Sequence, residues 1–386
     1  HLFLARPGSS ALCSFSPTAL AMSILVFNAG SSTLKFALFD AGANNSIASG
    51  VIESTEQEKA VAEAMRQLAE PVRREAVTAV GHRIVHGGSQ FQESVRIDER
   101  VKAGIAKLAE LAPLHNPPAL EALTLAEKAL PAIPHVAVFD TAFFSHLPPV
   151  ASIYPLPYEW HLQWGVRRFG FHGISHAYCA DRAAQLVPNL SRLIICHLGN
   201  GCSASAVKDG KAIATTMGFT PMEGLMMGTR AGSVDPGLLL YLQRGRGLTI
   251  EQLDQDLNHG SGLLGVSGVS SDYREVETAA GKGNQRARLA LDMFADRVRS
   301  TIGAFTATLG GIDVLVFTAG IGEHSANLRA AACTGLECLG MHLDPQANAS
   351  CRADAEIAGK DSHARVLVIH TREELLIARE ALRVGR

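Results

Sequence analysis

The feature that most constrains the fold is a strand–turn–strand unit that occurs twice in the chain. In the first copy, apolar runs at 24–27 and 34–39 flank the small polar turn Asn28-Ala-Gly-Ser-Ser. In the second copy, runs at 193–196 and 203–207 flank His197-Leu-Gly-Asn-Gly. Such a turn can direct several backbone N–H groups at one anion, although most tight glycine turns are simple hairpins.

A third glycine turn, Thr318-Ala-Gly-Ile-Gly, follows the apolar run 314–317. Residues 323–330 beyond it have a helical rather than an extended pattern. Three turns of this kind, the first two on hairpins, predict a duplicated α/β domain with phosphate loops that face each other across a cleft.

Helices are expected at 56–69, 98–111, 116–130 and 171–186. Asn116 precedes two prolines and is the expected N-cap of the third of these helices. Residues 148–170 are rich in proline and aromatic residues, so the domain boundary is placed near their start.

Residues 1–21 lack any period of a strand or helix, and Met22 directly precedes the first strand. We interpret 1–21 as an upstream or expression-derived leader that is disordered. A secretory signal fits less well, because Arg6 is the sole basic residue and Pro7-Gly interrupts the apolar stretch.

Composition excludes several classes of protein. Hydrophobic residues make up 47% and charged residues 19% of the chain, which argues against disorder. A net charge of −2 gives no broad basic surface for nucleic acid, and no apolar run approaches the roughly 18 residues of a membrane span. Seven cysteines without a Cys-x-x-Cys pair indicate reduced thiols in a cytoplasmic protein.

Two arginines stand in glycine-rich surroundings. Arg83 lies between Gly81 and Gly87 at a strand end, and Arg230 lies in a long glycine-rich loop that also carries Asp235. Because the guanidinium fork suits carboxylate and phosphate oxygens, the pair predicts an anionic transition state. The alternative for the loop is an ordinary charged surface.

Histidines supply further candidates. His172 and His176 are spaced for one helix face and could bind a metal, but glycine follows His172 where the zinc-protease signature has glutamate. We therefore expect one catalytic and one structural histidine. A P-loop motif and a Gly-x-Ser-x-Gly nucleophile motif are both absent from the sequence.

The chain resembles the acetate kinase (acetokinase) family of the acetate and sugar kinase/Hsp70/actin superfamily. The resemblance begins at Met22 and rests on specific stretches, among them Asn28-Ala-Gly-Ser-Ser-Thr-Leu-Lys, Phe169-Gly-Phe-His-Gly-Ile-Ser-His, His197-Leu-Gly-Asn-Gly and Phe317-Thr-Ala-Gly-Ile-Gly-Glu. It implies an α/β fold of duplicated actin-like (ribonuclease H-like) domains. These would be an N-terminal domain at 22–147, a C-terminal nucleotide-binding domain at 148–370, and a helix at 371–386 that packs back on the first domain.

The resemblance also assigns site residues by position. The implied catalytic residues are Arg83, His115, Asp140, His172 and Arg230. The implied substrate pocket combines Arg83 with Val85, Leu114, Phe171 and Pro221. The implied ATP-binding residues are Lys35, His197, Gly199, Asn200, Gly201, Asp272, Tyr273, Arg274, Gly320, Ile321 and Gly322. Asn28 and Glu373 match positions near a magnesium ion, and Arg372 departs from the family pattern beside them.

The activity implied is reversible transfer of the γ-phosphate of ATP to acetate by direct in-line displacement, with Mg²⁺ or Mn²⁺, in a cytoplasmic homodimer. A carboxylate substrate is already ionised at neutral pH, so Asp140 is expected to orient groups rather than to abstract a proton. Alternatives are a propionate or butyrate kinase, because one methylene changes specificity by only about 1–3 kcal/mol, and a non-metabolic ATPase of the superfamily.

Glu373 has a structural alternative nearby. Thr371-Arg-Glu-Glu fits a capping box in which Thr371 is the N-cap and Glu374 its reciprocal partner. That arrangement would leave Glu373 free to face the cleft, and the choice between Glu373 and Glu374 stays open.

Overall fold

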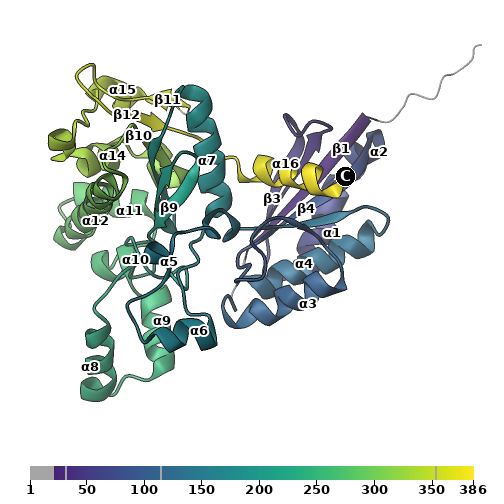
Figure 1. Ribbon diagram of the computed structural model, residues 1–386, viewed down its shortest axis with the longest axis horizontal. Coiled ribbons are helices and arrows are strands. Elements are labelled where there is room, and N and C mark those ends of the chain that lie inside the picture. The colour runs from purple at the N-terminus through teal and green to yellow at the C-terminus, as the bar shows by residue number, and fades with distance from the viewer. Residues whose placement is uncertain (1–20, 31–32, 114, 353) are drawn as a thin grey trace, which may run out of the picture.

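The structure, a computed structural model, describes residues 21–30, 33–113, 115–352 and 354–386. Two lobes, each built around a six-stranded sheet, make up the described chain (Figure 1). Residues 1–20 of the expected leader and Leu114 of the expected pocket lie outside the described residues.

The first sheet has the strand order β3-β2-β1-β4-β6-β5. Strands β1, β2 and β3 form an antiparallel meander, β4 and β6 add parallel to β1, and β5 closes the edge antiparallel. The strands are β1 Ala21–Ala29, β2 Thr33–Asp40, β3 Ser46–Glu53, β4 Glu75–Ile84, β5 Val95–Arg96 and β6 His135–Phe139.

The second sheet, β9-β8-β7-β10-β12-β11 when listed from the meander edge, repeats this order. The directions repeat as well, since β7–β9 are antiparallel, β10 and β12 add parallel, and β11 is antiparallel. The strands are β7 Arg192–Leu198, β8 Cys202–Lys208, β9 Lys211–Thr215, β10 Val314–Thr318, β11 Ala355–Glu356 and β12 Arg365–Val368. The predicted duplication is therefore confirmed.

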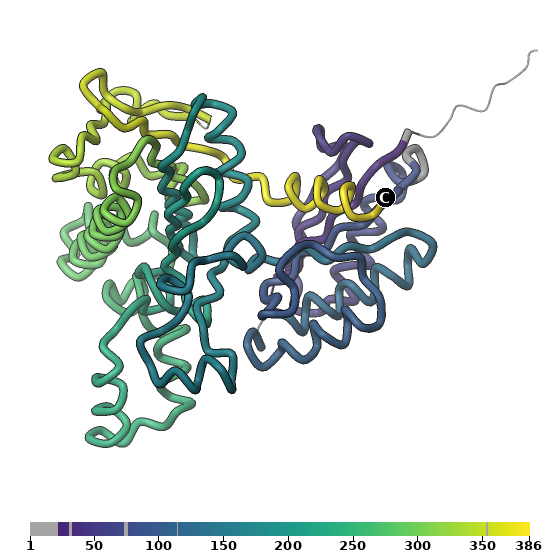
Figure 2. The backbone as a smooth tube through the Cα atoms, in the orientation of Figure 1, coloured from purple at the N-terminus to yellow at the C-terminus, as the bar shows by residue number. Residues whose placement is uncertain are grey.

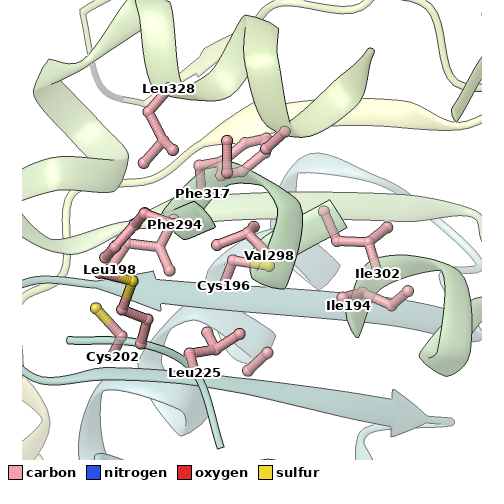
Figure 3. Packing of buried hydrophobic residues seen from close by; sticks show 14 of the residues in the cluster. Ile194, Cys196, Leu198, Cys202, Leu225, Phe294, Val298, Ile302, Phe317 and Leu328 are labelled. Atoms are coloured by element: carbon pink, nitrogen blue, oxygen red, sulfur yellow. The ribbon is translucent and has the colours of Figure 1, made fainter. Parts of the chain in front are cut away.

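Both faces of each sheet are buried, which explains the continuous apolar runs of the central strands. In β1, Leu25 and Phe27 pack with α1 (Gln57–Gln67) and α4 (Asn116–Ala129), whereas Ile24 and Val26 face α16 (Glu373–Gly385) and α7 (Gly173–Leu186). In β7, Ile194 and Cys196 pack against the long helix α12 (Gln285–Leu309) on the outer face (Figure 3). The shared core between the lobes is thus made by α7 and α16.

Helices cover these faces and connect the strands. In the first lobe they are α1 Gln57–Gln67, α2 Ala69–Arg74, α3 Glu99–Lys107 and α4 Asn116–Ala129. The following part of the chain forms α5 Pro149–Ser152, α6 Tyr158–Trp164, α7 Gly173–Leu186, α8 Pro236–Arg246, α9 Ile250–His259, α10 Gly262–Ser267 and α11 Tyr273–Gly281. The remainder are α12 Gln285–Leu309, α13 Ala319–His324, α14 Ala326–Cys333, α15 Pro345–Ser350 and α16 Glu373–Gly385, with short 3₁₀ turns at 108–110, 142–144 and 336–339.

The last helix returns to the lobe in which the chain starts. Figures 1 and 2 show α16, in yellow, beside the purple and blue strands of the first lobe, while the preceding residues belong to the second. Its buried residues Leu375, Ile377 and Ala378 join the core shared by both lobes. The two crossings between the lobes are therefore the chain directly after β6 and the chain before α16, because Phe144 and Leu147 already pack with Ala212 of the second lobe.

Two local predictions are wrong. Asn116 is the first residue of α4 rather than its N-cap, because its side chain is used elsewhere: its amide accepts from the N–H of His86 and donates to the carbonyl of the same residue. The third glycine turn is itself helical, since α13 begins at Ala319. The carboxylate of Glu323 accepts the Ala319 N–H at 2.9 Å and so stabilises this early start.

Among the helices of the described residues, none is long and apolar enough to cross a membrane. The six cysteines in the same residues are free thiols, and four of them are buried: Cys179, Cys196, Cys202 and Cys333.

Candidate active site

Two cavities meet at the second glycine turn. The first, here called the arginine cavity, has a volume of about 260 Å³ and is lined by residues of both lobes. Its lining comprises Gly30, Thr33, Arg83, Val85, His115, Asp140, Phe171, His172, His197, Gly199, Asn200, Gly201, Pro221 and Arg230. The structure thus brings together all five predicted catalytic residues and four of the five predicted pocket residues, with Arg83 belonging to both sets.

The second, here called the tyrosine cavity, has a volume of about 690 Å³ and belongs to the second lobe alone. It shares Gly199 and Asn200 with the arginine cavity. The rest of its lining comprises Ser271, Asp272, Tyr273, Arg274, Glu277, Gly320, Ile321, His324 and Ser325. Seven of the predicted ATP-binding residues therefore gather here, and the shared turn leads from one cavity to the other.

Arg83 and Asp140 form a buried ion pair at the ends of β4 and β6. Arg83 Nη2 donates to Asp140 Oδ2 at 2.6 Å, Nε donates to the same oxygen at 3.1 Å, and Nη1 donates to Asn28 Oδ1 at 3.3 Å. Burial lowers the pKa of Arg83, but the carboxylates of Asp140 and Glu373 outweigh it and the net shift is upward. The guanidinium is therefore held charged and in one orientation.

Arg230 faces the same cavity without a carboxylate partner among the described residues. Its Nη1 donates to the carbonyl of Pro221 at 2.5 Å, which holds the side chain against the loop that carries it. Burial lowers the pKa of Arg230 below its usual range. An anion that enters the cavity would form an ion pair with this guanidinium. That pairing would offset the free-energy cost of burying a charge without a partner.

The loop that carries Pro221 is itself anchored. Arg168 Nη2 donates to Glu223 Oε1 at 2.6 Å, and the Tyr154 hydroxyl donates to the other carboxylate oxygen of Glu223. The Phe219 N–H donates to the Tyr154 oxygen at 2.9 Å. These partly buried contacts hold the loop on both sides of Pro221, whose carbonyl accepts from Arg230. Asp235 of the same loop is instead the exposed N-cap of α8, so it does not reach the site.

Three histidines line the arginine cavity. Burial, with the charges of Arg83 and Arg230, lowers the pKa of His115 to about 4 and that of His172 well below 6.5. The rings of His172 and His197 stack with centroids 4.3 Å apart. Burial also lowers the pKa of His197. Each ring is consequently neutral at neutral pH and can donate one N–H without adding charge.

Asn28 connects the first glycine turn to α16. Its Nδ2 donates to Glu374 Oε1 at 3.1 Å and to Glu373 Oε2 at 3.5 Å. The capping box proposed for this helix is wrong: the N-cap is Arg372, and Thr371 Oγ1 donates to Ser175 Oγ at 2.9 Å. Both glutamates are therefore free of helix capping and lie beside Asn28.

Oxygen ligands of this kind suit a hard cation. Mg²⁺ is typically held by one or two carboxylates and keeps several waters, so Glu373 and Glu374 with Asn28 fit its chemistry. No group of three or more His, Cys, Asp or Glu side chains that could hold a metal occurs in the described ranges. Arg372 lines a separate small cavity with Tyr178 and Asp354, away from this set.

The tyrosine cavity is shaped by the start of α11. The Asp272 carboxylate caps this helix by accepting the N–H of Arg274 at 2.8 Å and pairs with its guanidinium at 2.6 Å. Tyr273 is buried and contacts Phe294 edge-on, which fixes one wall of the cavity. Gly228 is not part of the lining but approaches the Asn200 backbone closely, and its N–H donates to the Asn200 carbonyl at 2.9 Å.

Some predicted residues lie outside both linings. Lys35 is exposed on β2 opposite Asn28, and Gly322 is buried inside α13. Sequence reasoning missed Thr33 in the arginine cavity and Ser271, Glu277, His324 and Ser325 in the tyrosine cavity. His324 follows the quoted stretch that ends at Glu323, and Ser271 directly precedes the predicted Asp272, so proximity to these residues could have indicated both. Glu277 lies one helical turn after Tyr273 in α11 and outside the stretches that carry the family resemblance, so no sequence feature indicated it.

Comparison with known proteins identifies the family of this chain. The model of the acetokinase family matches residues 55–379. The chain belongs to the acetokinase family. An acetate kinase from Cyanothece sp. is 56% identical over 307 residues, which cover 79% of this chain and 75% of that protein.

Solved structures of the family share the fold. The structure of Porphyromonas gingivalis acetate kinase is 39% identical with a TM-score of 0.87, over 95% of this chain and 100% of that one. A propionate kinase from Francisella tularensis is 38% identical with a TM-score of 0.89, over 94% of this chain and all of that one. The prediction of a duplicated actin-like α/β fold in the acetokinase family is therefore confirmed.

Proposed function

We propose that the protein is an acetate kinase, a phosphotransferase that moves the γ-phosphoryl group of ATP to acetate and back. The observation that carries this proposal is the arginine cavity, where Arg83 and Arg230 converge beside the small apolar wall of Val85 and Phe171. A methyl group would contact that wall while the carboxylate meets the guanidinium groups. The relatives named as acetate kinases support the same activity.

In this proposal ATP occupies the tyrosine cavity, with adenosine near Tyr273 and Ile321. The phosphates then extend along Gly199 and Asn200 into the arginine cavity, because these two residues belong to both linings. The two arginines neutralise charge on the transferring phosphoryl group, and His115, His172 and His197 add neutral N–H donors. Asp140 orients Arg83 rather than taking a proton, since the acceptor carboxylate is already ionised.

Glu373, Glu374 and Asn28 are the residues that would hold Mg²⁺ or Mn²⁺. When bound, the ion would neutralise phosphate charge beside the arginines. The contacts of Asn28 with both carboxylates support either glutamate in this role, with Glu374 at the shorter distance.

The test is to trap acyl phosphate as a hydroxamate from Mg-ATP with acetate, propionate or butyrate in parallel. The proposal predicts product with acetate at the highest kcat/KM. Product chiefly from propionate would support the second candidate, to which the likeness with the propionate kinase points. ATP hydrolysis that is independent of any carboxylate would contradict both.

A homodimer in the cytoplasm completes the proposal. Helices α6, α8 and α9 contain no buried residue, yet Leu162, Trp164, Tyr241 and Ile250 are each more than half exposed on them. Such a surface suits a second copy of the chain. Sedimentation equilibrium should give the mass of two chains, and Leu162→Glu with Ile250→Glu should give one. The free thiols of the described cysteines support a reducing compartment.

A further inference from the structure

Two serines and two histidines form a hydrogen-bonded chain that ends at the arginine cavity. Ser203 and Ser205 are alternate residues of β8 and so face the same side of the sheet. His172 and His176 are one helical turn apart at the start of α7. His176 Nδ1 lies 2.8 Å from Ser205 Oγ, His176 Nε2 lies 2.8 Å from Ser203 Oγ, and His172 Nδ1 lies 2.9 Å from the same Ser203 oxygen.

The donor and acceptor in each of these hydrogen bonds follow from the buried end of the series, Ser205. Ser205 is fully buried, and its hydroxyl has His176 Nδ1 as its single recorded partner in the described residues. A buried hydroxyl without an acceptor is unfavourable, so the Ser205 hydroxyl donates to His176 Nδ1. A neutral imidazole that accepts at Nδ1 carries its proton on Nε2.

The proton on His176 Nε2 determines the direction of the other two hydrogen bonds. His176 Nε2–H donates to the oxygen of Ser203, whose own hydrogen is then directed to His172 Nδ1. His172 must therefore also carry its proton on Nε2. Burial holds the pKa of both rings well below 6.5, which is consistent with neutral imidazoles throughout the chain.

His172 Nε2 faces the turn of the second lobe. A Cβ placed on Gly201 would lie 3.2 Å from His172 Nε2 and 2.7 Å from Arg230 Nη2, so these two nitrogens border the same small space. The backbone of His172 is in the left-handed region at φ +59°, where a non-glycine residue is strained. The fold thus holds the ring in this position at some cost.

We propose that Ser203, His176 and Ser205 are positioning residues that fix His172 as its Nε2–H tautomer and so present a neutral N–H donor to the anion in the arginine cavity. The opposite tautomer would direct a lone pair at the same anion. The identity of that anion as the transferring phosphoryl group rests on the proposed function.

The first test reads the tautomers directly in the intact protein. Long-range ¹H–¹⁵N correlation spectra of a ¹⁵N-histidine sample distinguish Nε2–H from Nδ1–H rings. The His172 signals are identified by their loss in His172→Gln, and those of His176 by their change in Ser205→Ala. Both rings should be Nε2–H tautomers. An Nδ1–H tautomer at either residue would overturn the proposal.

The second test breaks the chain between the two rings. In Ser203→Ala, the His172 signals should change to a mixture of tautomers. With acetate, kcat should fall by about 10- to 100-fold, while KM for ATP changes little. Ser23→Ala is the matched control, because Ser23 is a fully buried serine whose hydroxyl has no recorded partner; its kinetics should equal those of the parent.

The outcomes separate the two proposals. A Ser203→Ala protein with unchanged His172 signals or unchanged kcat would overturn the positioning role and leave the proposed function intact. A parent protein that forms no hydroxamate with any acid would instead contradict the proposed function, whatever tautomers the spectra report.

Discussion

Arg83 and Asp140 form an ion pair across two adjacent parallel strands, with Nη2 and Oδ2 separated by 2.6 Å. The register that pairs Ile84 with Phe139 brings both residues to the same sheet edge. Only 2% of the Asp140 side chain and 19% of the Arg83 side chain is exposed. The carboxylate therefore directs one guanidinium into the arginine cavity, while Arg230 enters from the opposite lobe.

Asp140→Asn should destabilise the protein by about 3 kcal/mol, because it leaves the Arg83 charge buried without its partner. Urea denaturation measures this change, and kcat should fall in parallel as Arg83 loses its orientation. The control is Glu63→Gln, which breaks an exposed arginine–carboxylate pair at 2.6 Å and should alter the unfolding free energy far less. Equal effects of the two substitutions would contradict the argument.

Arg230→Ala should lower kcat by about 10³-fold while KM for ATP changes little, because the guanidinium faces the transferring group rather than the nucleotide. Steady-state kinetics with hydroxamate trapping would measure both constants. Arg297→Ala, at an exposed position of α12, should leave them unchanged. A large rise in KM with little loss of kcat would make Arg230 a binding residue only.

Val85→Ala should widen the apolar wall of the arginine cavity and raise kcat/KM for propionate relative to acetate by about 10-fold, within the range of one methylene. The measurement is the ratio of the two kcat/KM values. Val77→Ala removes the same atoms from β4, the strand that ends just before Val85, but Val77 lines neither cavity, so its ratio should match that of the parent.

Gly228→Ala should damage the nucleotide side of the site. A Cβ there would lie 2.0 Å from Asn200 Oδ1, so the residue shared by both cavities would be displaced. We expect kcat/KM for ATP to fall about 100-fold. Gly303→Ala is the control, because its Cβ would meet nothing within 4 Å on α12 and should stabilise the helix by about 1 kcal/mol.

Stability should fall as the pH is lowered from about 6.5 to about 4. Burial lowers the pKa of His86 and of His115 from 6.5 to about 4, so in this window the unfolded chain binds more protons than the folded one. Their contribution is complete above pH 6.5 and is lost as the pH falls toward the folded-state values. Urea denaturation at several pH values measures the slope.

His86→Asn should reduce that slope, since it removes one titrating ring and keeps an oxygen that can replace Nδ1 as the acceptor of the Gly88 N–H. His259→Gln, at an exposed position, is the comparison. An unchanged slope in His86→Asn would show that His86 is not among the groups responsible.

The strand–turn–strand units could be predicted because apolar runs and glycine turns are local signals. Both hairpins form where the pattern places them, with Asn28 opposite Lys35 and His197 opposite Ser203. The failures at Asn116 and Thr371 have a common cause. Each side chain fits a helix-capping pattern but is bonded to a distant residue instead, His86 in one case and Ser175 in the other.

Apolar runs, glycine turns and specific stretches were enough to predict the duplicated α/β architecture and the family, because these signals lie in residues close together in the chain. Which side chains meet depends on the tertiary packing, because the partners lie far apart in the chain. Asn28 reaches Glu374 across 346 positions because α16 returns to the first lobe. The stacked His172 and His197, and the serine chain behind them, exist because α7 packs on the second sheet, and no local pattern encodes that contact.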